Sequence, residues 1–172
     1  MESKKVSESF TTFTQIVMPN DTNSMNNLMG GNLLKWMDIA SGICGGKHAN
    51  RLVVTAAVDN VSFTRPLKIG DVVTIHAQVT RVFHTSMEIF IEVYKENYRQ
   101  RDKVKCNEAF YTFVALDEDG RPVECCDVLP ETEDENYRFE RALRRRELRL
   151  ILAGRMKPEE ATELKEIFLE KS

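Results

Sequence analysis

The sequence MPNDTNSMNNLMGGNLLKWMDIASGICGGKH, residues 18–48, decides the predicted fold. It opens as a polar, turn-rich loop, since Pro fixes φ and Asn, Asp and Ser side chains bond nearby backbone groups. After Gly30 and Gly31 it becomes helical, with apolar residues at helical spacing: Leu33, Met37, Ala40 and Cys44. Leu34, Trp36 and Ile43 widen this apolar surface. We therefore expect a helix buried on most sides, beginning near residues 28–31 and ending at Gly45 and Gly46.

Strand-like segments lie on both sides of this helix in the sequence. Residues 9–17 precede it, and residues 52–63, 72–82, 87–94 and 105–116 follow it, all rich in β-branched or aromatic residues. Apolar residues alternate at 73, 75, 77 and 79 and again at 87, 89, 91 and 93. The hairpin-like spacing of the four later strands predicts an antiparallel meander. The expected fold class is α+β, an antiparallel sheet wrapped around one long central helix.

Composition excludes several classes of function. The chain has 172 residues, 42% hydrophobic and 30% charged, with a net charge of −3, which is typical of a globular protein with no bias toward nucleic acid or membrane. We find no apolar run long enough for a transmembrane helix. The first ten residues, MESKKVSESF, lack the apolar core of a signal peptide, so a cytoplasmic location is expected.

The four cysteines, Cys44, Cys106, Cys125 and Cys126, are expected to be reduced packing groups. No CxxC motif occurs, and none of the three histidines falls at metal-ligand spacing with a cysteine. We therefore predict no metal site. Cys125 and Cys126 are adjacent, and the strained geometry of neighbouring residues disfavours an ordinary disulfide.

A change in composition after Pro130 predicts a separate C-terminal part. Residues 9–130 are expected to form the main domain, and residues 131–172 a C-terminal helical extension. Thr132 and Glu135 fit a capping box at the start of a helix that Gly154 would end. Pro158 would open a second, shorter helix.

Asp38 is the first candidate for chemistry. Its helical neighbours Leu34 and Gly42 place it beside the buried surface, where a carboxylate is unfavourable unless polar partners solvate it. Such an environment suits a general base or a nucleophile. The alternative is an exposed acid at the edge of the helix.

The start of the helix and the loop before it supply further candidates. Gly30 and Gly31 have no side chains to block approach, so backbone N–H groups and the positive end of the helix dipole can meet a developing negative charge. The alternative is a steric requirement for glycine in a tight turn. Asn23 either takes part in catalysis or caps a turn. The histidines form no catalytic triad with these residues.

Six stretches of the chain carry a resemblance to a known family: VMPNDTN (17–23), MGGNLLKWMD (29–38), VDNVSFTRPLKIGDVV (58–73), SMEIFIEV (86–93), AFYTFVALDEDGRP (109–122) and VLPETEDENYRFE (128–140). In this succession the chain resembles the hotdog-fold acyl-CoA thioesterases, in the acyl-CoA hydrolase branch found in bacteria and as tandem repeats in animals. The resemblance implies that Asn23 and Asp38 act in hydrolysis. It also implies that the helix N-terminus, about Gly30 and Gly31, polarises the thioester carbonyl.

Spacing within the helix adds a prediction about assembly. Asp38 lies seven residues after Gly31, roughly 10 Å along the helix axis. A thioester carbon must lie about 3–3.5 Å from its nucleophile while its oxygen meets the N–H donors. We therefore expect a homodimer in which Asn23, Gly30 and Gly31 of one chain face Asp38 of its partner. The family resemblance implies the same, and dimers in this family commonly form hexamers, as trimers of dimers.

The expected substrate is an acyl-CoA, with CoA as part of the substrate and no cofactor. Positive or polar groups that would bind the CoA nucleotide are Arg65, Lys68, Arg81 and Ser86, with the arginine run at residues 144–146 as a further candidate. Two alternatives stay open. One is a hydratase or dehydratase, which would need a histidine near the helix start, and none precedes His48. The other is a non-catalytic acyl-CoA-binding regulatory module.

Overall fold

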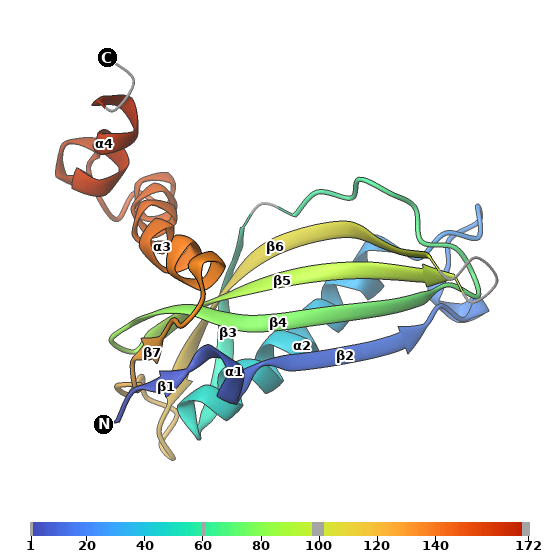
Figure 1. The fold of residues 1–172 in the computed structure, drawn as a ribbon, viewed down its shortest axis with the longest axis horizontal. Coiled ribbons are helices and arrows are strands. Elements are labelled where there is room, and N and C mark those ends of the chain that lie inside the picture. The colour runs from blue at the N-terminus through green and yellow to red at the C-terminus, as the bar shows by residue number, and fades with distance from the viewer. Residues whose placement is uncertain (1, 60, 98–101, 170–172) are drawn as a thin grey trace. The chain divides into compact units, whose positions relative to one another are not determined.

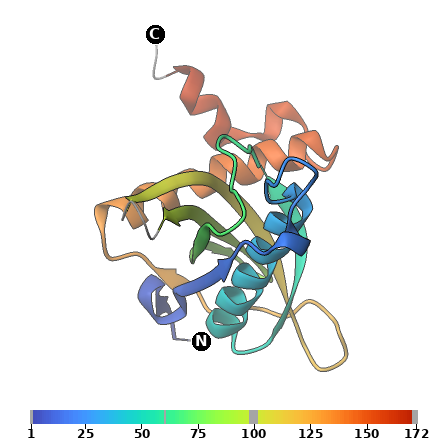
Figure 2. The same cartoon turned by 90° about the vertical axis from the view of Figure 1, so that its right-hand side faces the viewer.

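The computed structural model describes residues 2–59, 61–97 and 102–169 (Figures 1 and 2). It divides into two compact units, with the boundary between Leu129 and Pro130. The elements of the first unit are β1 (Lys4–Lys5), α1 (Val6–Ser9), β2 (Thr11–Ile16), a 3₁₀ turn (Pro19–Asp21), α2 (Gly30–Ala49), β3 (Leu52–Asp59), β4 (Val72–Phe83), β5 (Ser86–Asn97), β6 (Asp102–Leu116) and β7 (Val128–Leu129).

Helix α2 lies along one face of a curled antiparallel sheet, and its predicted apolar stripe is buried. Leu33, Met37, Ala40 and Cys44 are all at most 3% exposed. They pack on apolar residues that alternate along the two central strands, and these are fully buried: Val73, Ile75, Ala77 and Val79 of β4, and Met87, Ile89, Ile91 and Val93 of β5. The predicted α+β fold is therefore confirmed.

The prediction that α2 ends at Gly45 and Gly46 is wrong, because the helix continues to Ala49 and Asn50 closes it in the left-handed conformation, with φ 52°. Gly45 has a packing role instead. A Cβ there would lie 3.3 Å from Ile89 Cδ1 and 3.4 Å from both Met87 Sδ and Val53 Cγ2. Glycine therefore lets the last turns of the helix approach the sheet closely.

The strand order of the sheet is β2-β4-β5-β6-β3. The predicted meander is confirmed for β4, β5 and β6 but is wrong for β3, which pairs with β6, Leu52 lying opposite Leu116. The reason is the helix: α2 joins β2 to β3 across the inner face of the sheet, and the two strands arrive at opposite edges. Strand β3 is thus an edge strand, and its exposed bonding groups are open to another chain.

The N-terminal residues close the end of the unit where α2 finishes. Strand β1 pairs in parallel with β7. Lys4 Nζ donates to the carbonyl oxygens of Lys47 (2.8 Å) and His48 (2.9 Å) and to Asn50 Oδ1 (3.0 Å). These bonds satisfy helix carbonyls that have no partner within the helix and place a positive charge at the negative end of its dipole.

The second unit consists of α3 (Glu133–Leu152), a 3₁₀ turn (Pro158–Glu160) and α4 (Thr162–Leu169). The predicted capping box is confirmed: Glu135 N donates to Thr132 Oγ1 (3.2 Å), and Thr132 N donates to Glu135 Oε2 (3.1 Å). Pro158 opens only the 3₁₀ turn. Helix α4 starts at Thr162 because the Glu147 carboxylate of α3 accepts from the first-turn N–H groups of Glu163 (3.3 Å) and Leu164 (2.7 Å).

Within the described residues, no helix combines the length and the apolar character needed to cross a membrane.

Candidate active site

The loop before α2 fixes the amide of Asn23 in one orientation. Asn23 Oδ1 accepts from the backbone N–H groups of Met25 (2.9 Å) and Asn27 (3.2 Å), and Asn23 N donates to Asn27 O (2.8 Å). Asn23 therefore does cap a turn. Because its oxygen is taken by two donors, the group it presents outward is the NH₂, which donates hydrogen bonds and accepts none. Such a group can hold a carbonyl oxygen, an oxyanion or a water.

The N-terminus of α2 is open. Met29 O accepts from Asn32 N (3.0 Å) and Leu33 N (3.2 Å), whereas the N–H groups of Gly30 and Gly31 have no hydrogen-bond partner in the described part of the chain. No heavy atom lies within 4 Å of a Cβ built on Gly31, and no acidic side chain lies in the first turn. Two unpaired donors at the positive end of a helix form a suitable oxyanion site.

Asp38 projects from α2 toward the edge strand β3. Thr55 Oγ1 donates to Asp38 Oδ1 at 2.5 Å. A β-bulge follows Thr55 directly, since the register with β6 shifts between Thr55 and Ala57, and such bulges often re-aim side chains beside active sites. The hydrogen bond holds one carboxylate oxygen in a fixed direction and leaves the other oxygen for chemistry. Asp38 is half-buried and Thr55 is exposed, so solvent still reaches this pair within one chain.

Tyr111 of β6 lies beneath the same part of the helix. Its side chain is 1% exposed, and its hydroxyl donates to Leu34 O at 3.4 Å. Burial raises the pKa of Tyr111 to about 12, and the negative charge of Asp38 adds to this effect. At neutral pH the phenol is therefore a neutral donor next to the carboxylate.

A single chain does not bring these groups to one point. Gly31 and Asp38 are on the same helix, seven residues apart, which separates them by roughly 10 Å along the axis but only about 20° around it. Gly31 and Asp38 thus lie on the same side of α2 without meeting.

Apolar side chains are exposed on α2 and on the edge strand β3. Ile39 and Ile43 are 38% and 44% exposed, and the neighbouring edge strand adds Leu52 at 78%, Val54 at 46% and Val58 at 44%. Ile39 and Ile43 lie about 100° and 140° around α2 from Asp38, so they do not share its side of the helix.

A pocket of about 340 Å³ lies at the N-terminus of α2, lined by Leu28, Gly30, Leu33 and residues 63–67. Phe63 forms one wall against the helix, since a Cβ on Gly30 would lie 3.2 Å from Phe63 Cζ. Thr64 Oγ1 donates to Cys106 O at 2.5 Å, which anchors this segment to β6. Asn107, which follows Cys106 on β6, is 6% exposed. Neither polar atom of its amide has a hydrogen-bond partner in the described part of the chain.

The four residues predicted to bind CoA do not form one patch in a single chain. Arg65 lines the pocket. The backbone of Lys68 forms an isolated antiparallel β-bridge with Asn27, in the loop before α2. Arg81 and Ser86 lie instead at the β4–β5 hairpin, opposite Glu88 and Phe83 respectively. The arginine run is on α3 in the second unit, where Arg144 pairs with Glu166 at 3.7 Å.

Sequence reasoning missed Thr55 and Tyr111. No local motif marks them, because each acquires its neighbour only when β3 and β6 pack against α2. The prediction that no histidine and cysteine combine as metal ligands was drawn from local spacing. Among the described residues, His48, Cys125 and Cys126 form one group of three possible ligands, at the other end of α2.

Comparison with known proteins defines the class. The thioesterase superfamily matches residues 25–100. The Bacillus subtilis protein YkhA, named an uncharacterized acyl-CoA thioester hydrolase, is 40% identical over 134 residues, covering 78% of each chain. An apo-hexameric acyl-CoA thioesterase superposes with a TM-score of 0.86 at 36% identity, covering 89% of this chain and 98% of the other.

A Staphylococcus aureus acyl-CoA hydrolase, solved with butyryl-CoA, CoA and CoA disulfide, gives a TM-score of 0.82 at 32% identity, covering 88% and 94%. Variants of that enzyme with one Asp, one Asn or one Thr replaced by alanine match equally, with TM-scores of 0.82, 0.84 and 0.81. The fold and these matches define a hotdog-fold thioester hydrolase. Within the thioesterase superfamily, this chain belongs to the acyl-CoA thioester hydrolase family.

Proposed function

We propose that this protein hydrolyses fatty acyl-CoA to a free fatty acid and CoA, at a site that two copies of the chain build together. The observation that carries the proposal is the layout of α2. The unpaired N–H groups at Gly30 and Gly31 and the Thr55-bound carboxylate of Asp38 belong to one helix but lie too far apart along its axis for one carbonyl.

Two antiparallel α2 helices resolve this separation. With the helices side by side, the N-terminus of one would lie against Asp38 of the other. The exposed edge of β3 supports the same arrangement, because an edge strand can pair with its copy across a two-fold axis. The hexamers among the related structures are consistent with a dimer that assembles further.

In the proposed reaction, the thioester oxygen accepts from the helix N–H groups and its carbon faces the partner's Asp38. The free carboxylate oxygen takes a proton from a water, and the water oxygen attacks the carbon. Negative charge then develops on the oxygen held by the N–H groups, a role in which one donor contributes about 10²–10³-fold in rate. Collapse of the intermediate breaks the C–S bond, and CoA leaves as a thiol after taking up the proton.

Asp38 can instead attack directly, giving a mixed anhydride that water hydrolyses. The two routes differ in one observable: only the second adds the mass of the acyl group to Asp38 in rapidly quenched protein. The NH₂ of Asn23 would hold the attacking water or the oxyanion. The pocket walled by Phe63 would take part of the substrate, with Arg65 at its rim toward CoA.

The S. aureus variants support this assignment of residues. In that enzyme the replaced asparagine and aspartate are 15 positions apart, and the aspartate and the threonine are 17 apart. Asn23, Asp38 and Thr55 have the same two spacings. We therefore assign Thr55 as the residue that positions Asp38.

A hydratase or dehydratase reaction is disfavoured by the position of His48. It lies 18 residues after Gly30, about 27 Å along the helix, and both of its ring nitrogens already have hydrogen-bond partners. No described histidine lies at the N-terminus of α2.

A subunit-mixing experiment tests both the activity and the composite site. Asp38→Asn and Asn23→Ala chains, carrying different tags, are each purified alone and also co-expressed, and release of free CoA thiol is measured. Each variant alone should be inactive. The mixed dimer contains one intact site, so statistical mixing should restore roughly a quarter of wild-type activity.

The outcomes separate the two parts of the proposal. No restoration in isolated heterodimers would place the site within one chain, although thiol release by the wild type would still establish hydrolysis. Acyl-CoA binding by the wild type without any thiol release would support the regulatory module instead.

A further inference from the structure

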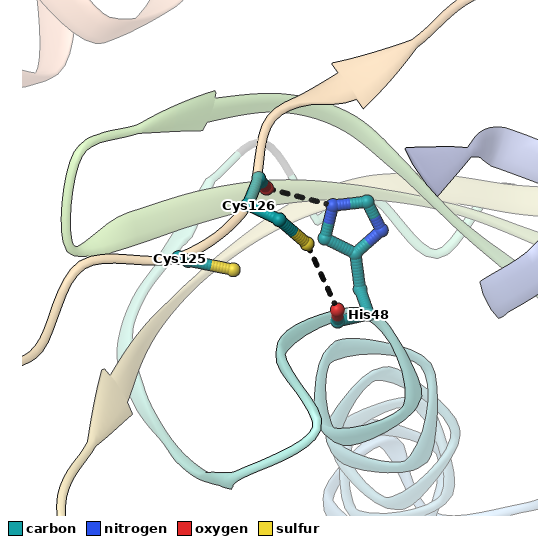
Figure 3. A group of neighbouring side chains, drawn as sticks. All are labelled: His48, Cys125 and Cys126. Carbon is teal, nitrogen blue, oxygen red and sulfur yellow. Dashed lines mark hydrogen bonds between the residues drawn. The ribbon is translucent and has the colours of Figure 1, made fainter. Parts of the chain in front are cut away.

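Three possible metal ligands meet where α2 ends. His48 lies in the last turn of α2, while Cys125 and Cys126 belong to the extended segment that leads into β7 (Figure 3). One ligand atom from each residue lies within 4.8 Å of the other two. All three residues are buried: His48 is 0% exposed, Cys125 6% and Cys126 8%. The histidine and the cysteines are nearly 80 residues apart in sequence, so the group exists only in the folded chain.

The backbone holds both thiols toward the histidine. Cys125 N donates to His84 O at 2.9 Å, and the Cys126 thiol donates to His48 O at 3.3 Å. In a regular strand, adjacent side chains point to opposite faces. Here the segment is irregular and both sulfur atoms lie on the side of His48 (Figure 3).

We propose that His48, Cys125 and Cys126 form a binding site for a thiophilic divalent cation of the Zn²⁺ class. Two thiolates and one imidazole are the donors that such ions prefer, in tetrahedral geometry. Zn–S and Zn–N bonds of about 2.3 and 2.0 Å place ligand atoms roughly 3.5–3.8 Å apart. The observed group needs only a small inward movement to reach that separation.

Ser9 allows His48 to become a ligand. His48 Nε2 lies 3.1 Å from Cys126 O, which can only accept, so Nε2 carries the proton and Nδ1 accepts from Ser9 Oγ at 3.3 Å. A hydroxyl both donates and accepts. If the proton moves to Nδ1, Ser9 Oγ accepts it and Nε2 presents its lone pair to the cation. An Nδ1–H bond of this kind is the usual outer support of a metal-bound histidine.

A route for the ion and a fourth ligand adjoin the group. Cys126 lines a pocket of about 570 Å³ with Lys4, Glu8 and Asn50, from which a water can complete the coordination. Two thiolates would neutralise the charge of a divalent cation, so the buried site would carry no net charge. Lys4, Glu8 and Asp127 are the charged groups whose fields act on His48.

Binding must displace protons. Burial raises the pKa of the Cys125 thiol to about 12, and its contact with Cys126 adds to this. The cation therefore competes with protons for the sulfur atoms, and its affinity should increase as the pH rises.

A titration of the fully reduced, chelator-treated full-length protein with Cd²⁺ and then Zn²⁺ tests the proposal. Cd²⁺ should produce a saturable ultraviolet thiolate charge-transfer band at one ion per chain, and Zn²⁺ should displace it. Cys125→Ser together with Cys126→Ser should abolish the band. Cys106→Ser is the matched control, since Cys106 is also buried but lies on β6 and outside the group; it should leave the band unchanged.

Ser9→Ala provides a second variant that keeps all three ligands. This variant should lower the affinity for the ion about 10–100-fold, as the loss of a hydrogen-bond partner of a metal-bound histidine does. Circular dichroism establishes that each variant is folded. Two results would overturn the proposal: no saturable band in the wild type, or an equal band in the double cysteine variant. An equal affinity in Ser9→Ala would overturn the role of Ser9.

Discussion

The two ends of α2 differ in hydrogen bonding and packing. At the C-terminal end, Lys4 caps the helix carbonyls, Gly45 packs tightly on the sheet, and His48 has partners at both ring nitrogens. At the N-terminal end, the first N–H groups are unpaired and Gly31 has open space around it. The difference teaches where to look for function. Polar groups that the chain satisfies itself build the fold, whereas groups that it leaves unsatisfied await a substrate or a second subunit.

Removing the Asp38 carboxylate should have the largest effect. Asp38→Asn keeps the size of the side chain and its bond from Thr55, but it removes the proton acceptor, so kcat should fall by about 10²–10⁴. Steady-state thiol release measures this. Asp119→Asn, in an exposed turn, is the control and should retain full activity. An Asp38→Asn protein with wild-type kcat would contradict the assignment of the catalytic carboxylate.

Gly31→Ala should separate function from folding. No atom lies within 4 Å of the new Cβ, and alanine in a helix is more stable than glycine by about 0.5–1 kcal/mol. The methyl group would nevertheless occupy the face where the thioester must approach, and a misplacement of about 1 Å can reduce kcat by roughly 10². Thermal unfolding and kinetics are compared with Gly42→Ala, whose Cβ would lie 3.7 Å from Phe113. A fall in Tm that parallels the fall in kcat would indicate a structural role instead.

Thr55→Val removes the hydrogen bond to Asp38 and retains the shape of the side chain. A hydrogen bond to a charged group contributes about 1.5–3 kcal/mol, so kcat/KM should fall roughly 10- to 100-fold. Thr55→Ser should restore most of the loss. An unchanged kcat/KM in Thr55→Val would mean that Thr55 does not position the carboxylate.

At the C-terminal end of α2, substitutions should change stability rather than catalysis. Gly45→Ala gains helix propensity but forces Ile89, Met87 or Val53 to move, and overpacking should leave a net loss of about 1 kcal/mol. Gly46→Ala is the matched control, because its Cβ would meet only Arg51 O at 3.6 Å. In denaturant unfolding, Gly46→Ala should have the higher free energy of unfolding and Gly45→Ala the lower. The reverse order would contradict the packing role of Gly45.

The last effect concerns the pH dependence of stability. Burial lowers the pKa of His48 below its usual value of 6.5. The unfolded chain then binds a proton more readily than the folded one, so stability should fall as the pH drops below about 6.5, by at most about 1.4 kcal/mol per pH unit. His48→Gln should flatten this dependence. His84→Asn, at an exposed position, should leave the slope as it is.

Hydrophobic periodicity in the sequence predicted helix α2 and strands β4 and β5, because this periodicity follows from local helix and strand geometry. The stripe from Leu33 to Cys44 and the alternation in β4 and β5 reflect helix and strand geometry, so they could be read directly from the sequence. Gly45 was misread because glycine signals both the end of a helix and a close approach, and only the residues across the interface distinguish the two. The edge position of β3 depends on the path of α2 over the sheet, which spacing does not encode.

The candidate site divides in the same way. Asn23, Gly30, Gly31 and Asp38 lie in one continuous stretch, so sequence could propose them, and their roles stay predictions. Thr55 and the His48 group depend on contacts between distant segments. His48 and Cys126 are 78 positions apart, a separation at which no motif spacing could have indicated the contact.

The strand order also has a kinetic consequence. Strands β4, β5 and β6 pair with their neighbours in sequence, and such local hairpins close quickly. Strand β3 must find β6 across fifty or more intervening residues, since Asp59 pairs with Phe110 and Leu52 with Leu116. Because long-range closure is slow, we expect β3 to dock late in folding. The strand that carries the hydrogen-bond partner of Asp38 would therefore join after the hairpins of β4, β5 and β6, and the carboxylate would acquire its orientation only when β3 has docked.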